Sequence, residues 1–364
     1  MASVWNVSKE PDLPFATIKD AVESGQTLDN ELIKLCPGWF VESVELKKSL
    51  TIFSSEGAEK TILSKPSNAD FIISIKKSRN KITGLQFAVG SYSIIIGDSS
   101  KNITNCEIKE CIIKNNMFLT QKSDSNYVHH NSFYDNLRIE NSSFNRIEDN
   151  VFDKSRIELD TKADDNIIKG NIIGNTKIGI QHYSYLEDVI KRNEIKNNFI
   201  GWDPNQKKLL PVEIGISLRY AQENIIEGNT IVAEERAEGD SHEIKFEYAS
   251  HNTLKNNHFG LDTSSALTFP RRVSVSISDE SNNNTFDKNY FVGNYFAALA
   301  IKISSMDNTI KNNFFGSEKS FVDELTLKHL RGTGVVVYQN CHNTTIDNNT
   351  FASIGACIGI KLSN

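Results

Sequence analysis

The segment Asn145-Arg-Ile-Glu-Asp-Asn150-Val-Phe152 recurs along the chain as a motif of two Asn residues, each followed two places later by an apolar residue. Other copies begin at Asn166, Asn224, Asn252, Asn284 and Asn308, a shifted copy spans Asn343 to Phe351, and degenerate copies span Asn102 to Ile108 and Arg192 to Ile200. The second Asn stands at positions 150, 171, 198, 229, 257, 289, 313 and 349, at intervals of 21 to 36 residues. A repeat of this length that grows by insertion is typical of a solenoid.

Each motif is expected to form a corner between two very short strands. The apolar residues can point inward, while the Asn takes a left-handed or bridge conformation that few side chains tolerate. If the coils stack, each Asn lies above the next, and the side-chain amides can hydrogen-bond along the column. The fixed spacing favours this interpretation over the disorder that Asn-rich sequences often show.

Before each corner lies a segment in which Val, Ile or Leu alternates with other residues, which is the pattern of a half-buried strand. These segments are Ile178–Ile180, Ile214–Leu218, Ile244–Phe246, Val273–Ile277, Ile301–Ile303, Val335–Val337 and Ile358–Leu362. The two-residue Asn-Gly or Asp-Gly turns of antiparallel hairpins are missing between them. The same order of strand, corner and strand in every repeat therefore predicts parallel stacking.

The N-terminal part of the chain carries a family resemblance. Phe15–Gly25, Glu31–Glu42, Ser49–Phe53 and Thr61–Leu63 resemble the opening of pectin-lyase-like β-helix proteins, in which an amphipathic helix plugs the first coil and a Pro-Gly turn precedes an extended strand. Ile18, Ala21 and Val22 lie on one face of that expected helix, which would cover an exposed strand edge, and Gly25 is its expected C-cap.

Later segments extend the resemblance to nearly the whole chain. Asn198–Asp203, Asn257–Asp262 and Asn313–Glu318 are similar to repeats of bacterial β-helix surface proteins and carbohydrate-active proteins. We therefore predict an all-β fold: a single-stranded right-handed parallel β-helix with a short N-terminal capping α-helix and about eight or more coils. The superfamily includes lyases, hydrolases, epimerases, tailspikes and non-catalytic proteins, so the resemblance implies the fold and leaves the activity open.

We expect residues 1–364 to form a single β-helix domain, with the cap at about 11–30 and coils over 31–364. Loop insertions recur at one point of the coil, directly before the alternating strand. They are expected near 204–212, 233–242, 263–272 and 318–333. Loops that leave stacked coils at the same point form a wall, and the outer sheet face beside that wall is expected to be a groove where function lies.

The composition and charge of the chain argue against several classes of partner and ligand. A net charge of −6 and the lack of a basic stripe give no support for nucleic-acid binding, and no apolar run is long enough to span a membrane. Residues 1–30 show no secretory signal, so we expect a cytoplasmic protein, or a secreted one if a leader was removed. The five Cys residues have no metal-ligand spacing and are expected to be buried: Cys36, Cys106, Cys111, Cys341 and Cys357.

Three outward columns of the alternating strands form the expected groove floor, most of it small or neutral and therefore open. One column contains Gln181, Ser217, Lys245, Ser276, Lys302, Val336 and Lys361. The next contains Tyr183, Arg219, Glu247, Ser278, Ser304, Tyr338 and Ser363, and the preceding one contains Gly179, Gly215, Glu243, Ser274, Ala300, Gly334 and Gly359.

Four charged residues cluster on this floor and are the candidate catalytic residues: Arg219, Lys245, Glu243 and Glu247. Strands about 4.8 Å apart would bring them together. Lys245 or Arg219 could act as acid or base while its neighbours neutralise a substrate carboxylate. The alternative is an ion-pair ladder on the protein surface without chemistry.

Weaker candidates for substrate binding surround this cluster. His182 and Tyr183 could border the floor, Trp202 and Tyr220 could stack on a sugar or anchor a loop, and Arg271 and Arg272 could hold carboxylates or phosphates at the rim. Lys302 and Tyr338 are the remaining floor candidates. No metal ligands are predicted and no cofactor is expected, although calcium stays open without a clear ligand motif.

We expect a carbohydrate-active enzyme of lyase or epimerase type that acts on an acidic sugar or polysaccharide. The alternatives are a non-catalytic β-helix that binds a glycan or protein, and a biosynthetic enzyme with a small intracellular substrate. The motifs of polygalacturonases, pectate lyases and alginate epimerases are missing, so whether the protein is an enzyme stays open. The chain stops on a strand, so another subunit, or further chain beyond Asn364, is expected to cover that edge.

Overall fold

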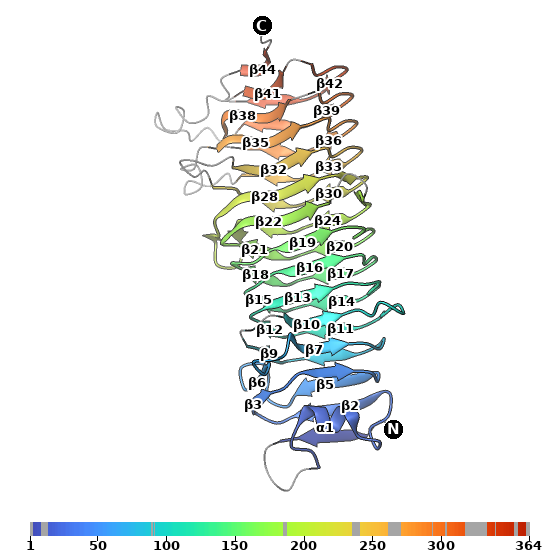
Figure 1. The fold of residues 1–364 in the computed structure, drawn as a ribbon. Coiled ribbons are helices and arrows are strands. Elements are labelled where there is room, and N and C mark those ends of the chain that lie inside the picture. Colours follow the sequence, from blue (N-terminus) through green and yellow to red (C-terminus); the bar gives the residue numbers. More distant parts are fainter. Residues whose placement is uncertain are drawn as a thin grey trace. The chain divides into compact units, whose positions relative to one another are not determined.

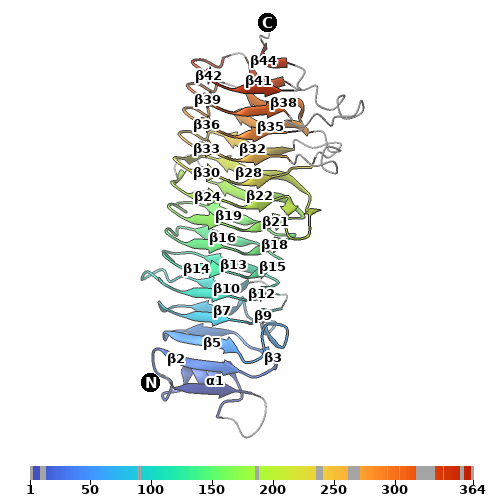
Figure 2. The same cartoon turned by 180° about the vertical axis from the view of Figure 1, so that it is seen from behind.

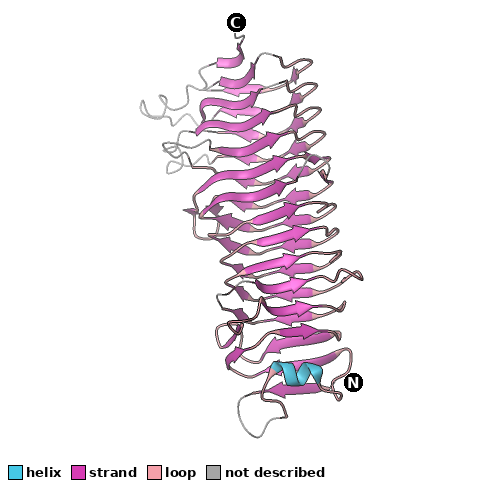
Figure 3. Ribbon diagram, in the orientation of Figure 1, coloured by secondary structure: helices cyan, strands magenta, loops and turns pink. Residues whose placement is uncertain are grey.

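The computed structural model describes residues 3–8, 14–88, 90, 92–184, 188–234, 241–260, 271–292, 294–302, 304–316, 333–338, 340–352 and 356–361. It contains two compact units, Met1–Ile167 and Ile168–Asn364, and each is described by itself. In both units nearly all regular structure is β-strand (Figures 1 and 3). No helix in the described part of the chain has the length and apolar character needed to cross a membrane.

The first unit holds three parallel sheets, which we name A1, B1 and C1. Sheet A1 contains, in spatial order, β1 (Val4–Val7), β2 (Glu31–Leu35), β5 (Leu50–Ser54), β8 (Lys81–Thr83), β11 (Glu107–Lys109), β14 (Tyr127–His129) and β17 (Arg146–Glu148). Sheet B1 contains β3 (Gly38–Val41), β6 (Thr61–Ser64), β9 (Gln86–Phe87), β12 (Ile112–Ile113), β15 (Ser132–Phe133) and β18 (Val151–Asp153). Sheet C1 contains β4 (Val44–Leu46), β7 (Phe71–Ile75), β10 (Tyr92–Ile96), β13 (Asn116–Leu119), β16 (Leu137–Glu140) and β19 (Ile157–Asp160).

The second unit repeats this plan with sheets A2, B2 and C2, and β20 (Ile167–Lys169) contains the boundary. Sheet A2 contains β24 (Glu194–Lys196), β30 (Ile225–Glu227), β33 (Thr253–Lys255), β36 (Thr285–Asp287), β39 (Thr309–Lys311) and β42 (Thr345–Asp347) (Figure 2). Sheet B2 contains β21 (Ile172–Gly174), β25 (Phe199–Ile200), β31 (Thr230–Ile231), β34 (His258–Phe259), β37 (Tyr290–Phe291), β40 (Phe314–Gly316) and β43 (Thr350–Ala352). Sheet C2 contains β22 (Thr176–Tyr183), β28 (Val212–Arg219), β32 (His242–Glu247), β35 (Arg271–Ser278), β38 (Asn294–Ile301), β41 (Thr333–Tyr338) and β44 (Ala356–Lys361).

Within each unit, successive coils contribute one strand to each sheet, and neighbouring strands of a sheet pair in parallel. The predicted parallel β-helix is therefore confirmed. Two small pairs lie outside the main sheets: β23 (Ile190–Lys191) is parallel to β29 (Ala221–Gln222), and β26 (Trp202–Asp203) is antiparallel to β27 (Lys208–Leu209). The latter pair forms a hairpin within the expected insertion near 204–212.

The N-terminal cap is helix α1 (Ile18–Glu23), which packs beside β1, β2 and β4. Thr17 caps it by accepting a hydrogen bond from the Asp20 backbone N–H at 3.0 Å, and Glu42 accepts two more from the first turn. Ile18, Ala21 and Val22 are buried, as predicted. The prediction for Gly25 is wrong, because the C-cap is Ser24 with φ −52°, and the unpredicted strand β1 pairs with β2.

The asparagine ladders connect the coils. At Asn257, the side-chain oxygen accepts hydrogen bonds from the backbone N–H and the side-chain amide of Asn229, both at 3.0 Å. Asn257 makes the same two bonds to Asn289, and its amide also donates to the Ile226 carbonyl. Each buried Asn therefore links three coils. One ladder of the second unit contains Asn171, Asn198, Asn229, Asn257, Asn289, Asn313 and Asn349, and the other contains Asn193, Asn224, Asn252, Asn284 and Asn308.

The left-handed residue of each corner is the one before the Asn, and of our two predicted conformations for the Asn itself, left-handed or bridge, the left-handed one is wrong. Asn256 has φ +55° and is exposed, whereas Asn257 is buried with an ordinary φ. The same holds before other ladder positions, at Asp149, Asp165, Asn197, Gly228, His251, Lys288, Asn283, Asp307, Asn312 and Asn348. The preceding residue makes the turn, and the Asn makes the hydrogen bonds.

Inside the corners, apolar residues form columns of their own. Four Phe rings of the second unit stack face to face with centroids 4.6 to 4.9 Å apart, and each stands two places after a ladder Asn: Phe259, Phe291, Phe315 and Phe351. This spacing matches the distance between neighbouring strands of a sheet. The two-place offset read from the sequence therefore places the core correctly.

The ladder of the first unit includes two corners that the motif search missed or misplaced. Asn126-Tyr-Val-His-His-Asn131-Ser-Phe133 is a full copy, and both of its Asn residues donate to the next coil. The degenerate copy does not lie at Asn102 to Ile108. Instead Cys106 and Cys111 stand in the two ladder positions, where their backbone N–H groups donate to Asn126 and Asn131.

Four Cys residues can be compared with the expectation of burial. Cys106 and Cys111 are buried, and burial raises the pKa of the two thiols to about 11 and about 12, so both stay protonated. Cys36 and Cys341 are only half-buried, so the expectation is wrong for them. The side chain of Cys357 lies outside the described residues.

Two glycine substitutions at adjacent positions can test the separate roles of the turn residue and the ladder Asn at a corner. We expect Asn257→Gly to lower the free energy of unfolding by about 2–4 kcal/mol, because it removes the amide and leaves buried partners without hydrogen bonds. Asn256→Gly keeps a residue that tolerates φ +55°, so we expect a change within about 1 kcal/mol. Urea unfolding followed by circular dichroism measures both, and equal effects of the two changes would contradict the ladder.

Candidate functional site

The outer face of sheet C2 carries half of the predicted site residues, and one of them, Lys302, lies in a different register from the prediction. Ser276 pairs with Ala300, not with Lys302, and Ala300 pairs with Val336. Lys302 therefore lies two residues further along, beside Ser278, where its N–H donates to the Ile277 carbonyl. The prediction set Ile303 opposite Ile277, but Ile301 takes that place, because alternation alone cannot tell Ile301 from Ile303.

The corrected register defines one column on this face, which we call the Arg219 column. Arg219 pairs with Glu247, and Glu247 pairs with Ser278. Because Val337 pairs with Ile301, Tyr338 lies beside Lys302. Tyr338 in turn pairs with Lys361, so the prediction that set Lys361 beside Val336 is wrong, and Gly359 takes that place. The column thus runs Tyr183, Arg219, Glu247, Ser278, Lys302 and Tyr338.

Arg219 lies among three tyrosines. Its guanidinium carbon is 5.5 Å from the ring centroids of both Tyr183 and Tyr220, within cation–π range. The Tyr220 ring stacks on Tyr248 of the next coil, with centroids 5.0 Å apart and planes at 11°. We call Tyr183, Arg219, Tyr220 and Tyr248 the Arg219 cluster.

The guanidinium has hydrogen-bonding capacity left over. Within the described ranges Arg219 makes no ion pair, and its Nε is buried without a hydrogen-bond partner. Tyr183 and Tyr248 are 37% and 40% exposed, so the aromatic part of the cluster reaches solvent. This combination fits a planar anion with an apolar body, such as an acidic sugar.

Sequence reasoning found three members of this cluster and missed Tyr248. Tyr220 and Tyr248 both follow the last residue of a C2 strand and both take a positive φ, +50° and +53°. An aromatic residue repeated at this one point of two successive coils was the signal that could have found it. Its stacking on Tyr220 makes it part of the same surface.

Lys245 and Glu247 form the second part of the candidate site. Lys245 Nζ lies 3.0 Å from Glu247 Oε1, with both side chains about three-quarters buried. The structure therefore brings together Arg219, Lys245 and Glu247, as predicted. The Glu247 carboxylate stabilises the charged ammonium, so Lys245 is better prepared to hold an anion than to accept a proton.

Glu243 does not join them on the accessible face. It is 0% exposed and stands beside Gly215, where an added Cβ would lie 2.3 Å from Ile231 Cγ2 and 2.6 Å from the Glu243 carbonyl. This column therefore turns toward the interior at the point where Gly215 lies, and side chains here cannot line a groove. The prediction that Glu243 belongs to an open floor is wrong.

The neighbouring column is also less open than expected. Gln181, Ser217, Lys245, Ser276, Ala300 and Val336 follow one another in it. Of these, Ser217, Ser276, Ala300 and Val336 are buried. Only Gln181 and Lys245 are half-exposed, so the accessible part of this column lies at its Arg219 end.

His182 is a core residue, and the prediction that it borders the floor is wrong. It pairs with Leu218 in a column that continues through Phe246 and Ile277, and it is 0% exposed. Among the residues that the structure describes, neither ring nitrogen has a hydrogen-bond partner. Desolvation lowers its pKa from 6.5 to about 3, so the ring is neutral. The strand alternation already places His182 on the side of Ile180, facing inward.

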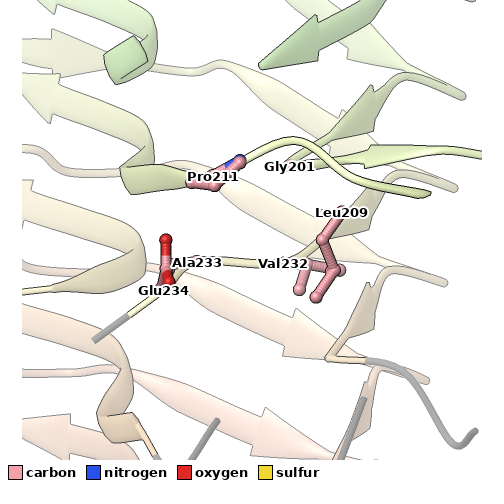
Figure 4. Close-up of a pocket in the computed structure, with 6 residues that line it drawn as sticks. All are labelled: Gly201, Leu209, Pro211, Val232, Ala233 and Glu234. Atoms are coloured by element: carbon pink, nitrogen blue, oxygen red, sulfur yellow. The ribbon is translucent and has the colours of Figure 1, made fainter. Parts of the chain in front are cut away.

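Trp202 anchors the β26–β27 hairpin. With Leu209 it packs against Val232, away from the Arg219 cluster. Figure 4 shows the hollow beside this hairpin, which is lined by Gly201, Leu209, Pro211, Val232, Ala233 and Glu234. Its lining is mostly apolar, and Glu234 is the one ionisable residue in it. The hollow suits loop packing better than acid–base chemistry.

Several predicted features lie wholly or partly outside the described residues. Arg271 and Arg272 begin β35, but their side chains are not among those described. The same applies to most of the insertions near 233–242, 263–272 and 318–333. In the part of the chain that is described, no group of three or more His, Cys, Asp or Glu side chains is placed to hold a metal ion.

Two family models match the chain. One, described as the right handed beta helix region, matches residues 185–315, and the other, described as the periplasmic copper-binding protein NosD, matches residues 53–208. The side chains in the described ranges do not fit a copper site, because they offer no group of three or more ligands. No curated protein matches the sequence.

Solved structures with the same fold include the following three proteins. One is DFA-IIIase of Arthrobacter chlorophenolicus A6 with DFA-III, at 12% identity and TM-score 0.56 over 94% of both chains. Another is the A-module of mannuronan C-5 epimerase AlgE6 of Azotobacter vinelandii, at 12% identity and TM-score 0.50 over 93% of both. The third is tailspike protein 3 of bacteriophage CBA120, at 10% identity and TM-score 0.54, where the match covers 93% of this chain and 57% of the tailspike. Such identities show the fold alone.

The buried position of His182 predicts acid sensitivity. The unfolded chain takes up a proton near pH 6.5, whereas the folded ring stays neutral down to about pH 3. The neutral ring therefore contributes stability that is present above pH 6.5 and is lost as the pH falls toward 3, by up to about 1.4 kcal/mol per unit.

His182→Leu removes this titration while preserving an apolar column. We expect the free energy of unfolding to fall less steeply between pH 6.5 and pH 5 in the variant than in the wild type, as measured by urea unfolding at several pH values. Identical slopes would show that His182 is solvated or paired in the folded protein.

Proposed function

We propose that this chain, which has the fold of a right-handed parallel β-helix, acts on an acidic carbohydrate at the Arg219 cluster. One observation carries the proposal: a guanidinium without an ion pair in the described structure lies between two tyrosine rings on an outer sheet face. Such a group binds a carboxylate through paired hydrogen bonds. The tyrosines offer an apolar ring face with a polar tip beside it.

The reaction that fits this arrangement starts at the carbon next to the sugar carboxylate. Neutralising the carboxylate by Arg219 makes the adjacent C–H more acidic, and a base then removes that proton. Loss of the neighbouring glycosidic oxygen, which takes a proton from the newly protonated base or from water, gives an unsaturated sugar and a free hydroxyl, as in a lyase. Return of a proton from water to the opposite face, while the base passes its own proton to solvent, gives the epimer.

Lys245 is the proposed base, with Glu247 as its partner. It lies one strand from Arg219 and two residues before Glu247, so a sugar bound to the guanidinium is within its reach. Its ammonium must lose a proton first, which the ion pair with Glu247 opposes. Substrate binding that draws Glu247 away would release this restraint.

The names of the similar structures support a carbohydrate as the substrate. Their names include an epimerase of a uronate polymer and an enzyme in complex with the sugar DFA-III. At 12% identity these names support the choice of carbohydrates for a first screen and leave the reaction to experiment.

A second candidate function is glycan binding without turnover. The 3.0 Å ion pair between Lys245 and Glu247 favours it, because a charged ammonium cannot act as a base. The two functions share the carboxylate site at Arg219 and differ in the role of Lys245.

Arg219→Ala tests the shared part. With soluble uronate polymers as probes, we expect the wild type to bind or to convert at least one polymer, and the variant to lose at least about tenfold in affinity or kcat/KM because the carboxylate partner is gone. Calorimetry measures binding, and ultraviolet absorbance of the unsaturated product or proton NMR of the epimer measures turnover.

Arg192→Ala is the matched control, since Arg192 is an exposed arginine of the same unit with an ion pair to Glu223 at 3.9 Å. It should behave like the wild type. Failure of every uronate polymer to bind or react, or equal behaviour of Arg219→Ala and wild type, would refute the proposal.

Lys245→Gln separates the two functions. If Lys245 is the base, we expect kcat to fall by about 10²-fold or more while the affinity for the polymer changes little. A weaker affinity with unchanged kcat, or binding of a polymer that the wild type never converts, would instead identify Lys245 as a binding residue.

A further inference from the structure

A second row of side chains crosses the outer face of sheet C1 in the first unit. It starts with aromatic rings at Tyr92 on β10 and Phe118 on β13, and it continues with Arg138 on β16, the Cα partner of Phe118. It ends in three carboxylates on β16 and β19: Glu140, Glu158 and Asp160. None of these residues belongs to the Arg219 cluster, and no part of the sequence motif singled them out.

The aromatic half forms a platform with an exposed end. The Tyr92 and Phe118 rings are nearly parallel, at 8°, with centroids 6.0 Å apart. The Arg138 guanidinium carbon lies 5.1 Å from the Phe118 centroid. Tyr92 is 37% exposed, so the platform is accessible at its Tyr92 end.

In the charged half of the row, both arginines already form ion pairs with carboxylates. Arg138 Nη2 contacts Asp160 Oδ2 at 2.6 Å and Glu140 Oε2 at 3.3 Å, and Arg156 contacts Glu158 Oε1 at 2.6 Å. Asp160 Oδ1 also accepts from the backbone N–H and the hydroxyl of Thr161. Three carboxylates against two arginines leave this group with a net negative charge.

One hydrogen-bond donor in the row, Arg138 Nε, has no acceptor among the described residues. Arg138 Nε is buried and has no hydrogen-bond partner in the described structure, although the other end of the same guanidinium holds two carboxylates. A buried N–H without an acceptor is costly. The Arg138 side chain as a whole is 40% exposed, so a ligand hydroxyl can approach the guanidinium between the aromatic platform and the carboxylates.

We propose that this row binds a neutral carbohydrate, at a site separate from the Arg219 cluster. A neutral sugar ring offers an apolar C–H face for Tyr92, hydroxyl donors for the half-exposed carboxylates and a hydroxyl acceptor for Arg138. A uronate would bring its carboxylate against a group that already carries net negative charge, and like charges at this distance repel. The two sites therefore select sugars of different charge.

The test uses the full chain and two sets of probes, neutral gluco-, manno- and fructo-oligosaccharides and oligouronates, with calorimetry as the readout. We expect at least one neutral oligosaccharide to bind the wild type. Tyr92→Ala should weaken that binding by about tenfold or more through loss of the platform. Glu158→Gln, which removes one carboxylate acceptor and leaves the Arg138 contacts in place, should weaken it as well.

Two controls keep this result apart from the proposed function. Tyr134→Ala removes a tyrosine of the first unit that is 49% exposed and follows β15 of sheet B1, and it should bind neutral sugars like the wild type. Arg219→Ala should lose uronate binding and keep neutral-sugar binding. The inference is overturned if no neutral oligosaccharide binds, if Tyr92→Ala and Glu158→Gln both bind like the wild type, or if Arg219→Ala abolishes neutral-sugar binding.

Discussion

The interaction on which the rest of this structure depends is the double hydrogen bond between stacked asparagines. One side-chain oxygen accepts from both the backbone N–H and the amide of the Asn in the previous coil, and the amide of the same residue donates to the next oxygen. A carbonyl oxygen has two lone pairs and an amide nitrogen has two hydrogens, so the ladder satisfies both. Because these groups are buried, a coil that slipped by one residue would leave them unpaired at a cost that few other contacts could offset.

The sequence predicted the fold well because the ladder residues and the core residues recur at fixed spacings. Asn at five-residue spacing with Ile or Phe two places later identified most corners, and the copy at Asn126 was missed only because its interior is Tyr-Val-His-His. Cys106 and Cys111 escaped detection because their backbone N–H groups, which need no particular side chain, make the bond to the next Asn. Lys302 was placed two residues off because alternation alone cannot tell Ile301 from Ile303.

The site was harder to predict, since it depends on which face each residue occupies and on what lies beside it. Arg219, Lys245 and Glu247 were grouped correctly because strand pairing in register brings them together. Glu243 and His182 are polar residue types like the three residues that were grouped correctly, yet both are fully buried. Residue type alone therefore did not reveal which face they occupy. Tyr248 acquires its place from stacking on Tyr220 across coils, a contact between residues 28 positions apart that no local pattern reports. Both proposed sugar sites lie at those outward positions of the C sheets whose side chains remain accessible.

Native-state hydrogen exchange of the ladder amides tests the central claim most directly. If the asparagine ladder holds the coils in register, the backbone N–H groups of Asn229, Asn257 and Asn289 exchange as slowly as those of the adjoining strand residues Ile226 and Leu254, because both open only when coils separate. Exchange of the three asparagines much faster than the strands would show that the corners open alone, and the account of register, core and both sites would lose its physical basis.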